Sequence, residues 1–257
     1  MKKKKGMSKK DFDELKKKSG LQEPERPYEV KVDFEDVPQY SGNIISVSDL
    51  SFSYGDKKIF DKVDFGLDME SRVTLVGKNG IGKSTLLKLI VGELEPNEGY
   101  VTKSNNLRIG YYHQHFEHFL PKDKTPVEFL EEMVPDNLIT GSKMQTVRKY
   151  LGTLKLESQA HNSLIGSLSG GQKARVAMVY LIFQKPNLIL FDEPTNHLDI
   201  ESIEALIEAL KEYNGGVMII THEPQLVMEL DYDLWLLKDN KINRYMKSFE
   251  DYIEEHI

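Results

Sequence analysis

The stretch GKNGIGKST, Gly77 to Thr85, decides the fold class of this chain. It follows the apolar run RVTLV at 72–76, which is typical of a buried strand. It precedes STLLKLIVGEL at 84–94, whose apolar spacing predicts a helix. A glycine-rich turn between a strand and a helix, ending in Lys-Ser-Thr, is the pattern of a phosphate-binding loop. We therefore expect an α/β domain built around this loop.

The residue types in this loop suit a nucleoside triphosphate. Glycines let the backbone curl, so that successive amides point at a phosphate. Lys83 adds a point charge between the β- and γ-phosphates, and the Ser84 hydroxyl can ligate Mg²⁺. A plain glycine-rich turn at a helix start would need neither of these two. We predict that the whole loop contacts the nucleotide: Gly77, Lys78, Asn79, Gly80, Ile81, Gly82, Lys83, Ser84 and Thr85.

Two adjacent acids end a second apolar run, LILFDE at 188–193. Burial penalises unpaired charge, so a pair of carboxylates in this place indicates a function. Asp192 is placed to hold the Mg²⁺ shell, and Glu193 to polarise an attacking water.

The surrounding pattern predicts an α/β domain with a mainly parallel central sheet. The run NIISVSDLSFSY at 43–54 alternates like a half-buried strand, whereas VMIITH at 217–222 is continuously apolar. Residues from about 116 to 167 lack strong strands and indicate a helical insert. Further helices are expected at 173–183 and 201–213, a hairpin at 233–245 and a closing helix at 248–256.

Composition narrows the class of protein. The chain has 257 residues, is 39% hydrophobic and 29% charged, and has no cysteine, which excludes disulfides and thiolate chemistry. It contains no apolar run near the roughly 20 residues of a membrane span. No apolar segment follows the basic start MKKKKGMSKK, so it does not resemble a secretory signal. A cytoplasmic protein is expected.

Charge is unevenly distributed along the chain. Residues 1–27 hold ten Lys or Arg against five Asp or Glu, while the rest holds 24 against 36. The acidic body is a poor general nucleic-acid binder, whereas the basic arm can contact phosphates or simply be a solvated charge run. We expect residues 1–42 to form a basic arm and linker tail, and residues 43–257 to form the domain.

A second loop, LSGGQKARV at 168–176, also has small residues before a helix. Ser169 offers a hydroxyl, Gly170 and Gly171 offer amides, and the helix starting near Gln172 presents its positive dipole end. A single domain needs one such loop for one nucleotide. We therefore expect the second loop to meet a γ-phosphate bound to another domain, in a head-to-tail pair.

The motifs FSYG, GKNGIGKST, YYHQH, LSGGQ, LILFDEPTNHLD and IITHE, in this order, resemble the ATP-binding cassette (ABC) family from about Asn43 to the end. EPTNHLD, LRIGYYHQH and FEDYIEEHI are similar to the second cassette of eukaryotic ABC-F proteins. Those are twin-cassette ATPases associated with ribosomes and translational control. The resemblance implies a P-loop NTPase fold with a mainly parallel core sheet, an antiparallel β subdomain and a helical subdomain.

The resemblance also implies roles for single residues. Tyr54 would stack on adenine, although a strand aromatic is by default a core residue. Gln114 would contact Mg²⁺ or the attacking water. Glu193 would be the general base, His222 would bond the γ-phosphate, and Asp199 would cross the interface to the second cassette.

Other histidines near these motifs have simpler interpretations. His113 and His115 flank Gln114, and solvated loop histidines are more common there than a metal site. His197 in EPTNHLD is interpreted as a capping or packing residue.

The resemblance implies hydrolysis of MgATP in a head-to-tail sandwich with a second cassette, in a longer chain or as a homodimer. The ATP state would be coupled to the ribosome or a translation factor, with no membrane partner. Two alternatives stay open: the nucleotide-binding subunit of a membrane transporter, and a slowly hydrolysing clamp held closed by ATP. Since one cassette is present, the chain is either a fragment or needs a partner.

Overall fold

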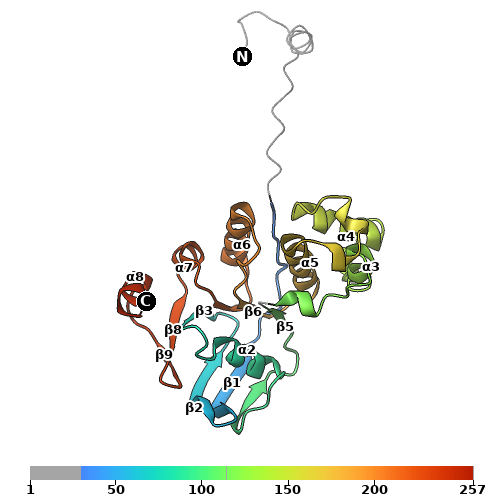
Figure 1. Ribbon diagram of the computed structural model, residues 1–257. Coiled ribbons are helices and arrows are strands. Elements are labelled where there is room, and N and C mark those ends of the chain that lie inside the picture. Colours follow the sequence, from blue (N-terminus) through green and yellow to red (C-terminus); the bar gives the residue numbers. More distant parts are fainter. Residues whose placement is uncertain (1–29, 114, 257) are drawn as a thin grey trace, which may run out of the picture.

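Two β-sheets of different kinds form the frame of the molecule in the computed structural model, which describes residues 30–113 and 115–256 (Figure 1). The larger sheet has the strand order β5-β6-β7-β3-β8-β9. Its first five strands in this order are parallel, and β9 runs antiparallel to β8. These strands are β3 (Arg72–Val76), β5 (Ile109–Tyr112), β6 (Leu188–Asp192), β7 (Gly216–Ile220), β8 (Asp233–Lys238) and β9 (Lys241–Arg244).

The central strands of this sheet are buried along their whole length. All five residues of both β6 and β7 are buried. Continuous apolar runs suit parallel strands that are covered on both faces, and this confirms the mainly parallel core. Because parallel strands end at the same edge, β3, β6 and β7 deliver the residues that follow them to one place.

The smaller sheet is antiparallel, with the order β2-β1-β4. It consists of β1 (Ile45–Tyr54), β2 (Lys57–Leu67) and β4 (Glu98–Lys103). A tight turn at Gly55 (φ +56°) joins β1 to β2 and pairs Tyr54 with Lys57. The sheet therefore ends beside the phosphate loop with an aromatic side chain and a cation.

Helices surround the sheets in two groups. In Figure 1, α3 and α4 lie beside α5 at one end of the molecule, while α6, α7 and α8 follow the other strands of the large sheet. Residues 116–167 are described without a strand, as the sequence predicts. The helices are α2 (Lys83–Val91), α3 (Pro126–Glu131), α4 (Lys143–Thr153), α5 (Gly170–Phe183), α6 (Ile200–Glu212), α7 (Pro224–Leu230) and α8 (Phe249–His256); short 3₁₀ turns are η1 (Phe116–His118), η2 (Asp136–Leu138), η3 (Ala160–Asn162) and η4 (Ile165–Ser167).

The start of the described chain packs on the body of the domain. Val32 and Val37 are buried in the main core. The Val37 N–H donates to Asn214 Oδ1 at 3.0 Å, and Phe34 contacts Tyr213 with ring centroids 5.5 Å apart. The expected border near residue 43 therefore falls after a stretch that already contacts the body. The rest of the expected basic arm lies outside the described residues.

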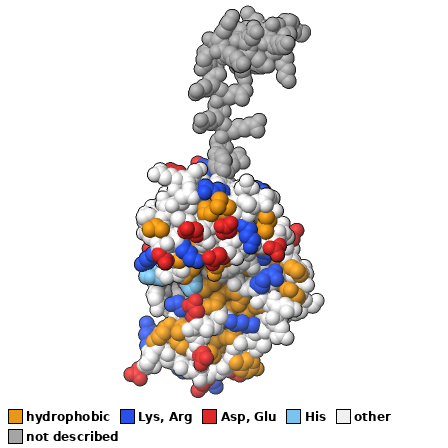
Figure 2. All heavy atoms as spheres, turned by 90° about the vertical axis from the view of Figure 1, so that its right-hand side faces the viewer, with side chains coloured by type: hydrophobic (Ala, Val, Ile, Leu, Met, Phe, Trp, Pro, Cys, Tyr) orange, Lys and Arg blue, Asp and Glu red, His pale blue; other side chains and the backbone are white. Residues whose placement is uncertain are grey.

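One face of the molecule carries a band of hydrophobic side chains, with charged side chains above and below it (Figure 2). In the part of the chain that the structure describes, no helix has both the length and the apolar character that crossing a bilayer requires.

Candidate functional site

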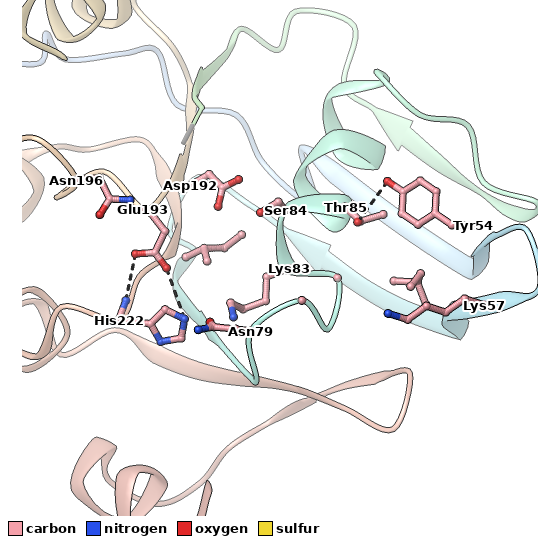
Figure 3. A pocket seen from close by; sticks show the side chains of 14 residues that line it. Tyr54, Lys57, Asn79, Lys83, Ser84, Thr85, Asp192, Glu193, Asn196 and His222 are labelled. Carbon is pink, nitrogen blue, oxygen red and sulfur yellow. Dashed lines mark hydrogen bonds and ion pairs between the residues drawn. The ribbon is translucent and has the colours of Figure 1, made fainter. Parts of the chain in front are cut away.

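A cavity of about 580 Å³ lies where β3, β6 and β7 end (Figure 3). Its volume falls in the usual range for small-molecule and cofactor sites, about 300–1,000 Å³. It brings together residues from the phosphate loop, the acid pair and the antiparallel sheet. The lining residues are Tyr54, Lys57, Ile59, Asn79, Gly80, Gly82, Lys83, Ser84, Thr85, Asp192, Glu193, Asn196, Ile220 and His222.

The phosphate loop depends on glycine at defined positions. Gly80 and Gly82 have φ values of +70° and +123°, where L side chains are strained. A Cβ on Gly82 would lie 2.3 Å from Ile59 Cγ2. The loop thus passes close under the small sheet and opens into α2 at Lys83, so that the helix N-terminus faces the cavity.

Lys83 is buried and bonded to its own loop. Its Nζ donates to the Gly77 carbonyl at 2.7 Å and to the Lys78 carbonyl at 3.2 Å. Burial lowers the pKa of Lys83, and the charges of Glu193 and Asp192 oppose this. An anion in the cavity would favour the charged form further, which suits a phosphate ligand.

Asp192 and Ser84 fit a divalent cation. Asp192 is 3% exposed, and its Oδ1 has no hydrogen-bond partner among the described residues. Burial raises the pKa of Asp192, with the Ser84 hydroxyl opposing the rise. A buried carboxylate oxygen without a partner, beside a hydroxyl, is the oxygen donor set that Mg²⁺ takes in phosphate sites.

Glu193 and His222 face each other across the cavity wall. The Glu193 backbone is left-handed (φ +52°), and its N–H donates to the Ile220 carbonyl at 2.8 Å. Its Oε2 accepts from the His222 N–H at 3.3 Å, while His222 Nε2 lies 3.6 Å from Oε1 (Figure 3). Burial raises the pKa of Glu193 and lowers the pKa of His222. The sharp turn after β6 therefore aims the carboxylate into the cavity.

Tyr54 stands at the opposite end of the cavity, at the mouth (Figure 3). It is 50% exposed, its hydroxyl lies 3.5 Å from Thr85 Oγ1, and Phe52 packs edge-on against the ring at 4.9 Å. An aromatic at this position is not a core residue. The phosphate groups and the aromatic ring are thus at two ends of one cavity.

Four lining residues were not predicted from the sequence, namely the apolar Ile59 and Ile220 and the polar Lys57 and Asn196. Lys57 follows from the pairing of Tyr54 with Lys57 across the β1–β2 turn, a hairpin signal that Gly55 supplies. Asn196 lies in EPTNHLD, three residues after Glu193.

Part of the phosphate loop faces away from this cavity. Gly77, Lys78 and Ile81 line a second cavity behind the loop. The contact of Lys78 with the nucleotide stays a prediction. The Lys78 carbonyl still holds Lys83.

The second loop closes on itself. The Ser169 hydroxyl accepts from the Gln172 N–H at 3.3 Å, and Gln172 Oε1 accepts from the Ser169 N–H at 3.0 Å, which is a capping box for α5. Gly170 packs against His197, since a Cβ there would lie 3.0 Å from His197 Nδ1. None of the described residues that line the nucleotide cavity belongs to 168–176.

Asp199 is engaged within its own chain. Its Oδ1 accepts from the Ser202 N–H at 2.9 Å as the N-cap of α6, and its Oδ2 accepts from Arg175 Nη2 at 2.6 Å. Its role across an interface stays a prediction. His197 is exposed, and its ring lies edge-on to Phe116 with 6.1 Å between centroids.

Gln114 lies outside the described residues, but its neighbours are placed. His113, interpreted as a solvated loop histidine, is partly exposed, with 29% of its side chain accessible. Its ring lies on Tyr111 at 3.7 Å between centroids, and its Nε2 is 3.3 Å from Glu93 Oε1. Burial lowers the pKa of His113. His115 is exposed.

The phosphate loop, the acid pair and the second loop, whose residues 168–172 we call the signature loop, define a P-loop ATPase of the cassette type. A family model described as ABC transporter matches residues 60–196, more than half of the chain. The chain belongs to this family and is similar to its F-type members.

Similarity to individual proteins agrees with this assignment. The chain is 42% identical to ABC transporter F family member 4 of Arabidopsis thaliana, over 90% of this chain and 33% of that protein. It is 39% identical to ATP-binding cassette sub-family F member 2 of Mus musculus, over 79% and 32%. It thus spans about a third of the curated relatives it matches. The solved dimer of MJ0796, described as a bacterial ABC transporter cassette, is 25% identical with a TM-score of 0.66, over 80% of this chain and 100% of that one.

Proposed function

We propose that this chain binds MgATP in the cavity of Figure 3 and hydrolyses it when a second cassette completes the site. The observation that carries the proposal is the separation of the two glycine-rich loops. The phosphate loop lines the cavity. The signature loop, residues 168–172, caps the start of α5 and does not line this cavity.

Within this cavity the residues have distinct roles. The loop amides and Lys83 bind the β- and γ-phosphates, and Tyr54 packs on the adenine at the mouth. Ser84 and Asp192 hold Mg²⁺, which neutralises charge on the phosphates when bound. Gln114 is proposed to join them on the evidence of the sequence alone.

Glu193 is proposed as the general base. The cavity wall holds it against the His222 backbone, and burial raises the pKa of Glu193, which strengthens it as a proton acceptor at neutral pH. Glu193 takes a proton from the attacking water, while the His222 side chain bonds the γ-phosphate.

The second cassette supplies what this chain lacks. In the capping box the Ser169 oxygen accepts a hydrogen bond, so its own O–H stays available to donate to a phosphate oxygen of a partner. The Gly170 and Gly171 amides lie in the first turn of α5, where backbone donors have no partner within the helix. Similarity to a cassette dimer supports this arrangement.

We further propose that the ATP state is coupled to the ribosome or a translation factor. The support is the likeness to F-type relatives and the motifs shared with them. The test is sedimentation of the Glu193→Gln chain with ribosomes through a sucrose cushion, with ATP and with ADP, beside membrane vesicles. ATP-dependent sedimentation with ribosomes supports the proposal. Association with vesicles alone favours the transporter subunit instead.

A further inference from the structure

The first described segment of the chain, residues 30–40, connects the helical insert (residues 116–167) to the core sheet. The Lys31 N–H donates to the Thr153 carbonyl at 2.9 Å, at the end of α4. Further along, Gln39 Nε2 donates to the Asn214 carbonyl at 2.9 Å, shortly before β7. We call this segment, the blue trace that leads to β1 in Figure 1, the strap. It contacts the insert at one end and the core at the other.

Glu35, in the middle of the strap, joins three segments of the chain. Its carboxylate accepts from Asn137 Nδ2 of η2, at 3.0 Å to Oε2 and 3.3 Å to Oε1. The same Oε2 lies 2.5 Å from the Nζ of Lys185, which follows α5. Lys185 Nζ also donates to Asn137 Oδ1. These three side chains form a closed triad between the strap, the insert and the connection from α5 to β6.

The triad is only partly open to solvent. The side chain of Lys185 is 21% exposed and that of Glu35 is 30% exposed. Charge-assisted hydrogen bonds that are partly buried contribute more than an ion pair on the open surface. The Lys185 backbone is left-handed (φ +46°), and its carbonyl accepts from Arg108 Nε at 2.7 Å. The connection after α5 is therefore held by the core through its backbone and by the strap through its side chain.

Helix α5 begins at the signature loop and ends beside the triad. Ser169 is its N-cap, and Lys185 comes two residues after its last residue, Phe183. Its 14 residues span about 21 Å. A tilt of about 10° around the Lys185 end would move the Ser169 end by roughly 4 Å, which is more than a hydrogen bond to a phosphate oxygen tolerates.

We infer that Glu35 is a positioning residue, which fixes the end of α5 and thereby the place at which the signature loop meets the second cassette. A loop that is already held in place loses less conformational freedom when a partner binds, so the triad should strengthen pairing. None of the described strap residues lines the nucleotide cavity of the chain itself. The inference rests on the proposed function, because it concerns the loop that would complete the nucleotide site of a partner.

The distance between two spin labels tests this positioning directly. The chain has no cysteine, so Leu164→Cys, four residues before the signature loop, and Met228→Cys on α7 place labels at these two exposed sites alone. We expect Glu35→Ala to broaden or shift the distance distribution of this labelled parent by roughly 4 Å, as measured by double electron–electron resonance. Glu132→Ala is the matched control, because it removes a carboxylate that bonds Lys124 at 3.0 Å within the insert. Its distribution should match that of the parent.

An exchange of charges separates positioning from a general loss of stability. Glu35→Lys combined with Lys185→Glu restores an ion pair, and the Asn137 amide can bond both partners because it donates and accepts. This double variant should recover the narrow distribution of the parent. An unchanged distribution in Glu35→Ala overturns the inference, as does equal broadening in Glu132→Ala.

Pairing driven by ATP connects the position of α5 to function. In the Glu193→Gln background, Glu35→Ala should weaken pairing with a second copy of the chain about 3- to 10-fold in analytical ultracentrifugation. The ATP affinity of the chain alone should stay within about twofold. Unchanged pairing would overturn the positioning role. Failure of the parent to bind ATP or to pair would instead count against the proposed function, and the label distances do not depend on that result.

Discussion

The phosphate loop and the signature loop look alike in sequence and differ in almost every structural respect. The first has glycines at φ +70° and +123°, approaches Ile59 closely, and surrounds a buried lysine. The second has no residue with positive φ, and its Ser169 is exposed and is the N-cap of α5. One is shaped to enclose an anion alone. The other lies at the surface, and we propose that it becomes a site when a second cassette covers it.

The largest effect, on the rate of ATP hydrolysis, is expected at the acid pair. This pair lies beside the phosphate loop and not beside the signature loop. Glu193→Gln should reduce ATP hydrolysis about 10²- to 10⁴-fold, because the amide cannot accept the proton from water. ATP binding should persist, since shape and hydrogen bonding are kept. Phosphate release and equilibrium binding, measured with a second cassette present, separate the two effects.

Glu223→Gln is the control for this substitution. Glu223 caps α7 by accepting from the Gln225 N–H at 3.4 Å and is not among the cavity-lining residues. Its rate should stay near that of the wild type. Hydrolysis by Glu193→Gln at the wild-type rate would remove Glu193 from the reaction.

Within the phosphate loop, two lysines should behave differently. Lys83→Ala loses two charge-assisted bonds to phosphate, so ATP affinity should fall about 100-fold, or ~3 kcal/mol. Lys78→Ala should change affinity less than about threefold, because Lys78 lines the cavity behind the loop and not the one that Lys83 lines. Isothermal titration of both variants measures this. Equal losses of ATP affinity in the two variants would show that the Lys78 side chain contacts the nucleotide.

The smallest expected effect is on the melting temperature. Its sign is opposite for a substitution in the nucleotide cavity and one in the signature loop. Burial raises the pKa of Asp192, so the stability that this group contributes at low pH is lost as pH rises through its folded-state pKa. Asp192→Asn should therefore melt about 2–4 °C higher at neutral pH without nucleotide, and this gain should vanish as pH falls.

Ser169→Ala should melt lower by a similar amount, because loss of an N-cap costs about 0.5–2 kcal/mol. Differential scanning calorimetry of the two variants at two pH values makes the comparison. Destabilisation by Asp192→Asn at neutral pH would show that the carboxylate is satisfied in the nucleotide-free chain, contrary to its lack of a partner among described residues.

Local pattern predicted the strand–loop–helix unit and the acid pair well. Each depends on neighbours in sequence, and the rule that parallel strands end at one edge brings them together. Contacts between distant segments could not be predicted. Lys78 lines a cavity together with residues of α8. His113 contacts Tyr111 and Glu93. Asp199 accepts a hydrogen bond from Arg175.

The measurement that tests the difference between the two loops most directly is the ATP affinity of Ser169→Arg in a chain shown by light scattering to be monomeric. Ser169→Ala is its control, because it loses the same cap without adding a cation. If the signature loop acts across an interface, Ser169→Arg should bind ATP within about twofold of that control, while losing ATP-driven pairing with a second cassette in the Glu193→Gln background. A loss of affinity beyond about tenfold in the monomer would show that this loop contacts the nucleotide of its own chain.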